Sequence, residues 1–225
     1  MYHFVKGIAN CISCNKEVQN ALYNSNFLPN LLTIISGFLL LFIIVVLFTY
    51  FSTRRFQKNR SLIRDKKILN PVPLSTASVV IGLGLGGFID GILFHQILQL
   101  HGMVSNKLPI TDLVGKAVNM FWDGIFHATT FMAVLIGFVL LVRLLKRKNI
   151  NPSPKLATGG ALIGWGIFNT VEGIIHHHIL KFHNVNEFAM NTDLWNYGFL
   201  LSGVLLLVIG YRVVYNRDHY PSRLE

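Results

Sequence analysis

The chain of 225 residues is 52% hydrophobic and only 13% charged, and its 20 basic and 10 acidic residues give a formal net charge of +10. Soluble globular domains carry about 25% charged residues and disordered chains have low hydrophobicity, so this composition excludes both classes. Two cysteines are too few for a disulfide framework. The position of each charge along so apolar a chain therefore becomes informative.

Five apolar segments are long enough to cross a bilayer, which requires about 20 residues. They cover approximately 28–52, 74–100, 117–145, 156–180 and 194–215. The first begins too far from Met1 for a cleaved signal peptide and lacks a small-residue cleavage pattern. Glycine clusters in the second and fourth segments indicate close helix packing. We predict an all-α integral membrane bundle of five transmembrane helices, because soluble core helices would not explain the basic connectors.

Most basic residues lie on one side of these spans. Fifteen of the 20 fall in the connectors after the first and third spans and in the C-terminal tail, against five on the other side. Because cytoplasmic segments are enriched in Lys and Arg, we expect the N-terminus outside and the C-terminus inside. This topology accounts for the net charge without nucleic-acid binding.

Three acidic residues fall inside the spans: Asp90, Asp123 and Glu172. An ionisable group at that depth costs about 3 kcal/mol or more and usually faces a polar partner or a cavity. Each acid begins an acid-Gly-Ile triplet.

The second and fourth spans share a longer pattern. The segment Asp90-Gly-Ile-Leu-Phe-His95-Gln-Ile-Leu-Gln-Leu-His101 aligns without a gap on Glu172-Gly-Ile-Ile-His-His177-His-Ile-Leu-Lys-Phe-His183. A matched acid and two matched histidines make chance similarity between apolar helices the weaker explanation. We interpret the pattern as an internal repeat of a helical hairpin, covering about 75–145 and 156–215, with both copies parallel in the membrane.

Helical spacing predicts which side chains converge, because positions four or eleven residues apart lie near one face. The predicted groups are Asp90 with His101, Asp123 with His127, and Glu172 with His176 and His183. We expect His95 and His177 to lie off these faces, either as a second stripe or in contact with a neighbouring helix. We also expect the two outermost histidines to lie ~16 Å above the acids of the same span, at 1.5 Å per residue.

Clustered imidazoles and carboxylates are typical ligands of Zn, Fe, Cu or Mn, and a ligating histidine usually donates its other N–H to an acceptor. The candidate ligands are Asp90, His95, His101, Asp123, His127, Glu172, His176, His177 and His183. We favour a transition-metal or metal-cofactor site open to the outer face, with a redox or metal-handling role. Haem between facing histidines stays open, because the spans are rich in Phe and Trp122 and Trp165 are near.

Other classes of function also fit the polar cluster. Asp–His hydrogen bonds could lock the bundle, or the same residues could relay protons. The protein would then be a non-catalytic subunit or an assembly factor of a respiratory complex. Known metal-binding motifs do not distinguish these alternatives. The HExxH motif is absent, and Glu172 and His176 are four residues apart, whereas the Glu-x-x-His motif of di-iron helix bundles requires a separation of three. His178 has no counterpart histidine in the other copy of the repeat. Whether the protein is an enzyme stays open.

Cys11-Ile-Ser-Cys14 precedes the first span, on the expected outer side. It could be an accessory redox pair or a soft ligand for copper. A local disulfide or two unused thiols explains the pair equally well. No histidine follows it, so it is not a c-type haem attachment site.

Three motifs carry a family resemblance: residues 87–101, Asp123-Gly-Ile-Phe-His127, and residues 166–178. Together they resemble bacterial predicted membrane proteins grouped as domain of unknown function 2243, over about 75–215. The resemblance implies a four-span domain of the bacterial inner membrane and assigns no activity and no functional residue. We therefore divide the chain into an extension, 1–70, with the Cys pair and first span, and a four-helix membrane domain, 71–225.

Overall fold

The computed structural model describes residues 15–24, 26–62 and 69–215, and within them the chain is all-helical without a strand. The α-helices are α1 (Lys16–Asn24), α2 (Phe27–Leu62), α3 (Val72–Ile89), α4 (Leu113–Leu145), α5 (Pro154–Glu172) and α6 (Thr192–Val214). Two π-helical segments, η1 (Asp90–Ile97) and η2 (Gly173–Ile179), continue α3 and α5. The predicted all-α class is confirmed.

Length and hydropathy mark four of the described helices as candidate membrane spans. They are Phe27–Arg60, Val72–Ile97, Leu113–Leu145 and Thr192–Val214. The remaining predicted span, 156–180, corresponds to α5 with η2, in which Asn169, Thr170, Glu172 and three histidines lower the hydropathy. Four of the five predicted spans thus meet this criterion, and the fifth stays a prediction.

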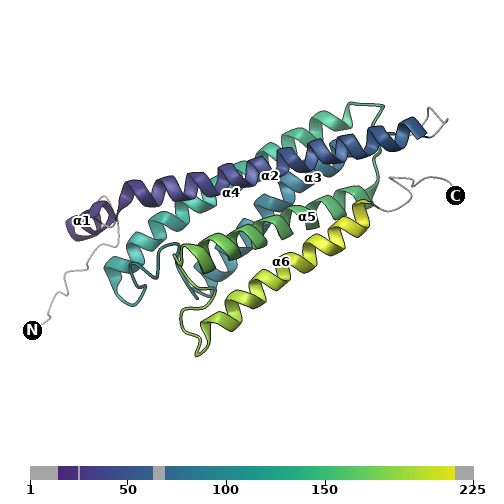
Figure 1. Cartoon of the computed structure of the whole chain (residues 1–225). Coiled ribbons are helices and arrows are strands. Elements are labelled where there is room, and N and C mark those ends of the chain that lie inside the picture. Colours follow the sequence, from purple (N-terminus) through teal and green to yellow (C-terminus); the bar gives the residue numbers. More distant parts are fainter. Residues whose placement is uncertain (1–14, 25, 63–68, 216–225) are drawn as a thin grey trace, which may run out of the picture.

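The helices run along one long axis, as Figure 1 shows. Helices α3 and α5 pack against each other at the centre, α4 packs on α3, and α6 packs on α5. The α3–α5 contact depends on glycine. A methyl group at Gly82 would overlap the backbone of Ala161, and one at Gly164 would overlap the backbone of Val79. Small residues of this kind let transmembrane backbones approach closely.

Helix α2 lies along the bundle and covers part of it. Its Phe27 ring packs 5.2 Å from the Trp122 ring, and Phe38 packs 6.1 Å from Phe126. Near its other end, Ser52 Oγ lies 2.5 Å from Tyr215 Oη. These contacts attach α2 to both α4 and the end of α6.

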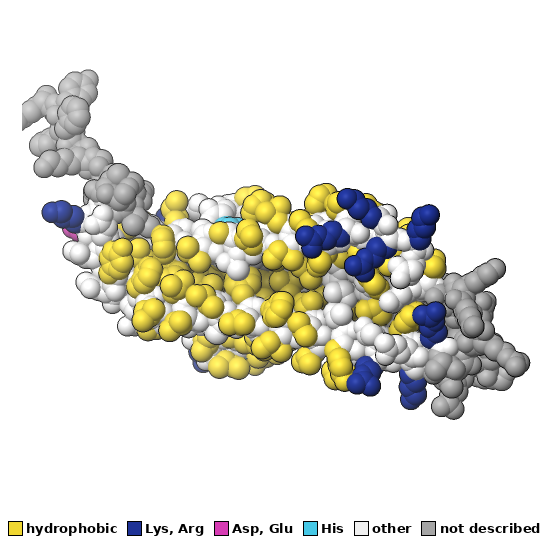
Figure 2. Space-filling view, turned by 90° about the horizontal axis from the view of Figure 1, so that it is seen from above, with side chains coloured by type: hydrophobic (Ala, Val, Ile, Leu, Met, Phe, Trp, Pro, Cys, Tyr) yellow, Lys and Arg dark blue, Asp and Glu magenta, His cyan; other side chains and the backbone are white. Residues whose placement is uncertain are grey.

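The surface is apolar over most of its length. In Figure 2, hydrophobic side chains cover the middle of the visible face, and most of the Lys and Arg side chains gather toward one end. Large side chains such as Phe42 and Phe51 on α2 are 65% and 63% exposed. An exposed apolar surface of this extent indicates contact with lipid.

The backbone repeats itself with the same offset of 82 positions that relates Asp90 to Glu172 in the sequence repeat. The π-helical segment η2 follows α5 where η1 follows α3. Two residues past the end of each segment, one residue lies in the left-handed region: Gln99 with φ 50° and Lys181 with φ 48°. The N–H of Leu98 donates to the carbonyl of Leu93, and that of Leu180 donates to Ile175, both at 2.8 Å. Both helices therefore stop in the same way before the chain reverses.

Candidate metal centre

The π-helical turns bring an acid and a histidine together in the first hairpin. Because π-helices bond residue i to residue i+5, side chains five positions apart lie on nearly the same face. His95 Nε2 consequently lies 3.3 Å from Asp90 Oδ2. The expectation that His95 and His177 lie off the acidic faces was wrong, because it assumed 3.6 residues per turn. The expected contact with a neighbouring helix is confirmed for His95, whose Nδ1 lies 2.7 Å from Asp123 Oδ1 of α4. His177 is buried and belongs to the same cluster.

His101 and His183 enter the cluster from loops rather than from helices. The helices end at Ile97 and Ile179, and the chain then folds back toward the bundle. As a result the His101 ring lies 4.2 Å from the His95 ring, and His183 Nε2 lies 3.4 Å from Glu172 Oε1. The predicted separation of ~16 Å, based on 1.5 Å per helical residue, was therefore wrong.

Three imidazoles that share one set of potential ligand atoms, those of His95, His101 and His183, each have Nδ1 engaged by an acceptor. His95 Nδ1 lies 2.7 Å from Asp123 Oδ1, His101 Nδ1 donates to Val185 O at 2.9 Å, and His183 Nδ1 donates to Met103 O at 3.1 Å. A carbonyl can only accept, so His101 and His183 carry their protons on Nδ1 when neutral. Their Nε2 lone pairs are then free, which is the arrangement found in metal-ligating histidines.

Burial keeps His101 in the form that binds metal. The side chain is fully enclosed, and this burial lowers the pKa of His101 well below its ordinary value. The ring is therefore neutral at pH 7, and a neutral imidazole is the ligating form.

Two sets of three side chains bring potential ligand atoms within 4.8 Å of one another. One set is His95, His101 and His183, and the other is Glu172, His177 and His183. All five residues are buried. The rings of His101 and His183 stack 4.7 Å apart and almost parallel, at 3°. Because both sets use His183, they form one continuous cluster.

Acceptor atoms face one another inside this cluster. His95 Nε2 and Asp90 Oδ2 are 3.3 Å apart, and His183 Nε2 and Glu172 Oε1 are 3.4 Å apart. None of these four atoms makes a well-aligned hydrogen bond within the described part of the chain, and the same holds for Asp90 Oδ1 and His101 Nε2. A buried polar atom without a partner costs about 1–3 kcal/mol, and more when it is charged. Carboxylates beside imidazole lone pairs repel unless a proton or a metal cation lies between them.

The structure forms some of the remaining predicted pairings and not others. His176 Nδ1 lies 2.7 Å from Glu172 Oε2, so the predicted pairing of these two residues is confirmed. Asp123, by contrast, bonds His95 rather than His127. His127 packs against Gly91 and stacks on Phe88 at 6.4 Å, outside both ligand sets. Cys11 and Cys14 lie outside the described residues.

His178, which breaks the sequence repeat, also lies apart from the ligand sets. Its Nδ1 lies 2.6 Å from the carbonyl oxygen of Gly173, and its ring packs 4.9 Å from the Tyr197 ring. The side chain is only half-buried.

Several supporting residues were not predicted. The carbonyl groups of Met103 and Val185 orient His183 and His101, and no side-chain pattern identifies a backbone acceptor in advance. Asn119 Oδ1 accepts from Val104 N at 2.8 Å, and Asn196 Oδ1 accepts from Val185 N at 2.9 Å. Asn119 and Asn196 each lie near the start of an otherwise apolar helix, α4 and α6. A polar amide in such a position was the sequence signal that could have identified them.

Comparison with known proteins agrees with these features. No curated protein and no solved structure matches the chain. The family described as Predicted membrane protein (DUF2243) matches residues 77–217, which include α3 to α6 almost entirely and every member of the cluster. Since this match covers more than half of the chain, the protein belongs to the DUF2243 family of predicted membrane proteins.

Proposed function

We propose that the protein binds a transition-metal ion within the membrane, with His95, His101 and His183 as imidazole ligands and Asp90 or Glu172 as the nearest carboxylate. The observation that carries this proposal is that the three imidazole rings have the same orientation of their two nitrogen atoms relative to the cluster. Each has Nδ1 held by an acceptor, and each directs a buried Nε2 into one cluster. The Nε2 atoms of His95 and His183 lie 3.3 and 3.4 Å from the nearest oxygens of Asp90 and Glu172.

The ligand set favours a borderline metal. Three imidazoles with a carboxylate suit Zn, Fe or Cu(II), whereas Cu(I) prefers thiolate or thioether ligands. Ligands at about 2.1 Å around a tetrahedral ion lie about 3.4 Å apart. The ligand atoms are now within 4.8 Å of one another, so metal binding would draw the rings inward. A bound ion would supply Lewis-acid or redox chemistry, and the protein's own groups hold and orient it.

A haem is a weaker candidate. Axial coordination by two histidines requires a porphyrin between their rings. The His101 and His183 rings are instead stacked directly on each other at 4.7 Å. We therefore rank a metal ion bound only by side chains above a haem.

We further propose the organisation and location in which this centre works. The features that recur 82 positions apart support an internal repeat, 75–145 and 156–215, within a membrane domain of 71–225 that follows an extension of 1–70. Basic residues at the ends of α2, α4 and α6 support a cytoplasmic location for that end of the bundle, in a bacterial inner membrane. The metal cluster then lies nearer the outer face.

Metal analysis of the purified protein tests the proposal. Wild type extracted in mild detergent should contain about one metal ion per chain, without a Soret band. His183→Ala should lose the ion, because His183 belongs to both ligand sets. His178→Ala is the matched control and should retain it, since His178 lies outside both sets.

Two results would overturn the metal centre. One is a wild type that neither contains metal nor is stabilised against heat by added Zn²⁺, Fe²⁺ or Cu²⁺. The other is a folded His183→Ala variant that binds metal as tightly as wild type. A metal-free wild type of high stability, with an unfolded His183→Ala variant, would assign the cluster a purely structural role.

A further inference from the structure

A cavity beside the histidine cluster opens through the lipid-facing surface. It has a volume of about 570 Å³ and lies between α3 with η1 on one side and α5 with α6 on the other. Small-molecule sites typically measure about 300–1,000 Å³. Its outer lining includes Ile89, Trp195 and Leu194, which are 38%, 44% and 68% exposed. A ligand would therefore enter sideways from the bilayer.

The corresponding position in the second hairpin is covered. Position 94 in η1 corresponds to His176 in η2, and α2 lies over His176. A Cβ atom at Gly37 of α2 would lie 3.5 Å from the His176 ring. Phe38 of the same helix packs on Phe126. Thus α2 covers His176 of the second hairpin, whereas Phe94, at the corresponding position of the first, lines the open cavity.

Two polar groups at the inner wall of the cavity can only accept hydrogen bonds from a ligand. Asp90 is 2% exposed and Asn169 is 5% exposed. Asn169 Nδ2 donates to Ser202 Oγ at 3.1 Å, and Ser202 Oγ donates to the carbonyl of Phe199 at 2.6 Å. This chain fixes the amide so that Asn169 Oδ1, which has no partner among the described residues, is the atom left to bind a ligand.

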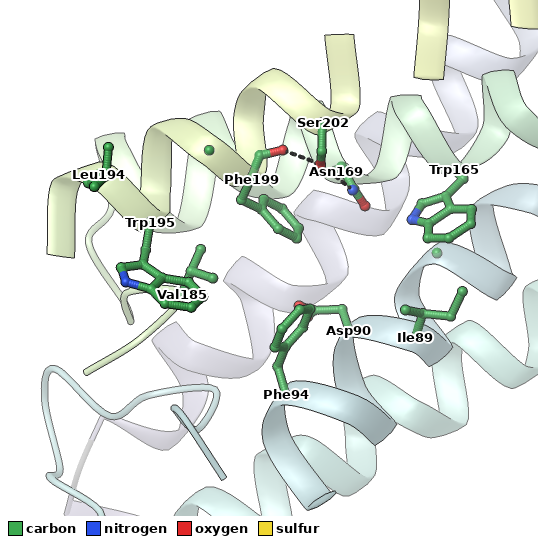
Figure 3. A pocket seen from close by; sticks show the side chains of 12 residues that line it. Ile89, Asp90, Phe94, Trp165, Asn169, Val185, Leu194, Trp195, Phe199 and Ser202 are labelled. Atoms are coloured by element: carbon green, nitrogen blue, oxygen red, sulfur yellow. Dashed lines mark hydrogen bonds between the residues drawn. The ribbon is translucent and has the colours of Figure 1, made fainter. Parts of the chain in front are cut away.

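Aromatic rings line the space around these acceptors. Figure 3 shows Asn169 and Phe199 on one side of the cavity, Asp90 and Phe94 on the other, and Trp165 and Trp195 toward its two ends. Flat aromatic ligands pack well against such rings. A ligand hydroxyl would satisfy the buried acceptors, whereas a ligand carbonyl would face them unfavourably.

We propose that this cavity binds a membrane-soluble hydroxylated aromatic molecule, such as a hydroquinone, whose ring lies among the aromatic side chains and whose hydroxyl donates to Asn169 Oδ1 or to Asp90. This binding site goes beyond the proposed metal centre. It shares Asp90 with the candidate ligands, but it rests on the cavity and on Asn169 Oδ1, whether or not the cluster holds an ion.

Calorimetric titration tests the site in the full-length protein. The protein is placed in lipid nanodiscs and titrated anaerobically with 2,3,5-trimethylhydroquinone, with empty nanodiscs subtracted. The dimethyl ether of the same compound has no hydroxyl to donate. It should bind at least tenfold more weakly, because its oxygens would face the unpaired acceptors. Equal affinities for the two compounds would contradict the proposal.

A pair of glycine variants locates the binding. Gly198 lines the cavity, and an added Cβ there meets nothing within 4 Å, so Gly198→Phe fills the cavity without a backbone clash. Gly124 on α4 is equally open and lies away from the cavity, so Gly124→Phe is the matched control. Binding should fall more than tenfold in Gly198→Phe and persist in Gly124→Phe.

The outcomes separate this proposal from the metal centre. Loss of hydroquinone binding in Gly198→Phe with unchanged metal content supports the cavity site. Hydroquinone binding by a wild type that binds no metal would support the cavity site and overturn only the metal centre. If wild type binds no hydroquinone and forms a dimer that Gly198→Phe dissociates, the cavity is an interface between two copies and the proposal is wrong.

Discussion

Asp123 shows how one atom can support the proposed centre. Its Oδ1 lies 2.7 Å from His95 Nδ1 and accepts from the N–H of Met103 at 2.9 Å. It thereby connects a candidate ligand to the loop whose Met103 carbonyl orients His183. A carboxylate in this position also makes the imidazole a stronger ligand.

Asp123→Asn should weaken metal binding without unfolding the protein. Asparagine keeps an Oδ1 that can accept both hydrogen bonds, but it lacks the negative charge. Loss of such a supporting carboxylate typically lowers metal affinity about 10–100-fold. Competition with a chelator of known affinity measures the change. The exposed Asp193→Asn is the control, and an unchanged affinity in Asp123→Asn would contradict this role.

At the level of residues, composition identified the acids and histidines but not their geometry. Asp90, Glu172 and the histidines were found because ionisable groups are rare and costly inside apolar spans. The contact between Asp90 and His95 was missed because a π-helical turn leaves no clear mark in a single sequence. The backbone carbonyls that hold His101 and His183 carry no side-chain signal at all.

The central helix pair gives a prediction for α3 and α5. Gly164→Ala should destabilise the protein by about 1–3 kcal/mol, the usual cost of overpacking. The added methyl group would lie 2.6 Å from Leu83 N and would also overlap the carbonyl of Val79, so backbone must move. Thermal unfolding in detergent measures the effect.

Gly124→Ala on α4 should not destabilise the protein, in contrast to Gly164→Ala. Its added methyl group meets nothing within 4 Å, and alanine is favoured over glycine in a helix by about 1 kcal/mol. This variant should be as stable as wild type or more stable. Equal stability changes in Gly124→Ala and Gly164→Ala would show that close packing of α3 and α5 is not the cause.

The helices themselves were predictable because long apolar runs leave few alternatives. Four of the predicted spans coincide with candidate spans, and the glycine clusters do pack α3 on α5. The helix ends were not predictable. Gln99 and Lys181, two residues past the ends of η1 and η2, have positive φ, a conformation that usually favours glycine or asparagine. The loops therefore begin earlier than hydropathy indicates.

For the whole molecule, residue accessibility tests the proposed orientation. In a chain carrying Cys11→Ser and Cys14→Ser, single cysteines are placed at Met190 and Lys148. Both positions are exposed, the first between η2 and α6 and the second between α4 and α5. A membrane-impermeant maleimide added to intact cells should label the Met190→Cys variant. It should label the Lys148→Cys variant only after the cells are permeabilised. The reverse pattern would invert the topology.

The reciprocal hydrogen bonds between the two loops have a consequence for biogenesis. His101 of the first hairpin is oriented by the Val185 carbonyl of the second, and His183 is oriented by the Met103 carbonyl of the first. Neither hairpin alone can hold its histidine in the ligating tautomer. A nascent chain with only the first hairpin inserted therefore has no competent site, and ion capture becomes a late step that reports completed assembly.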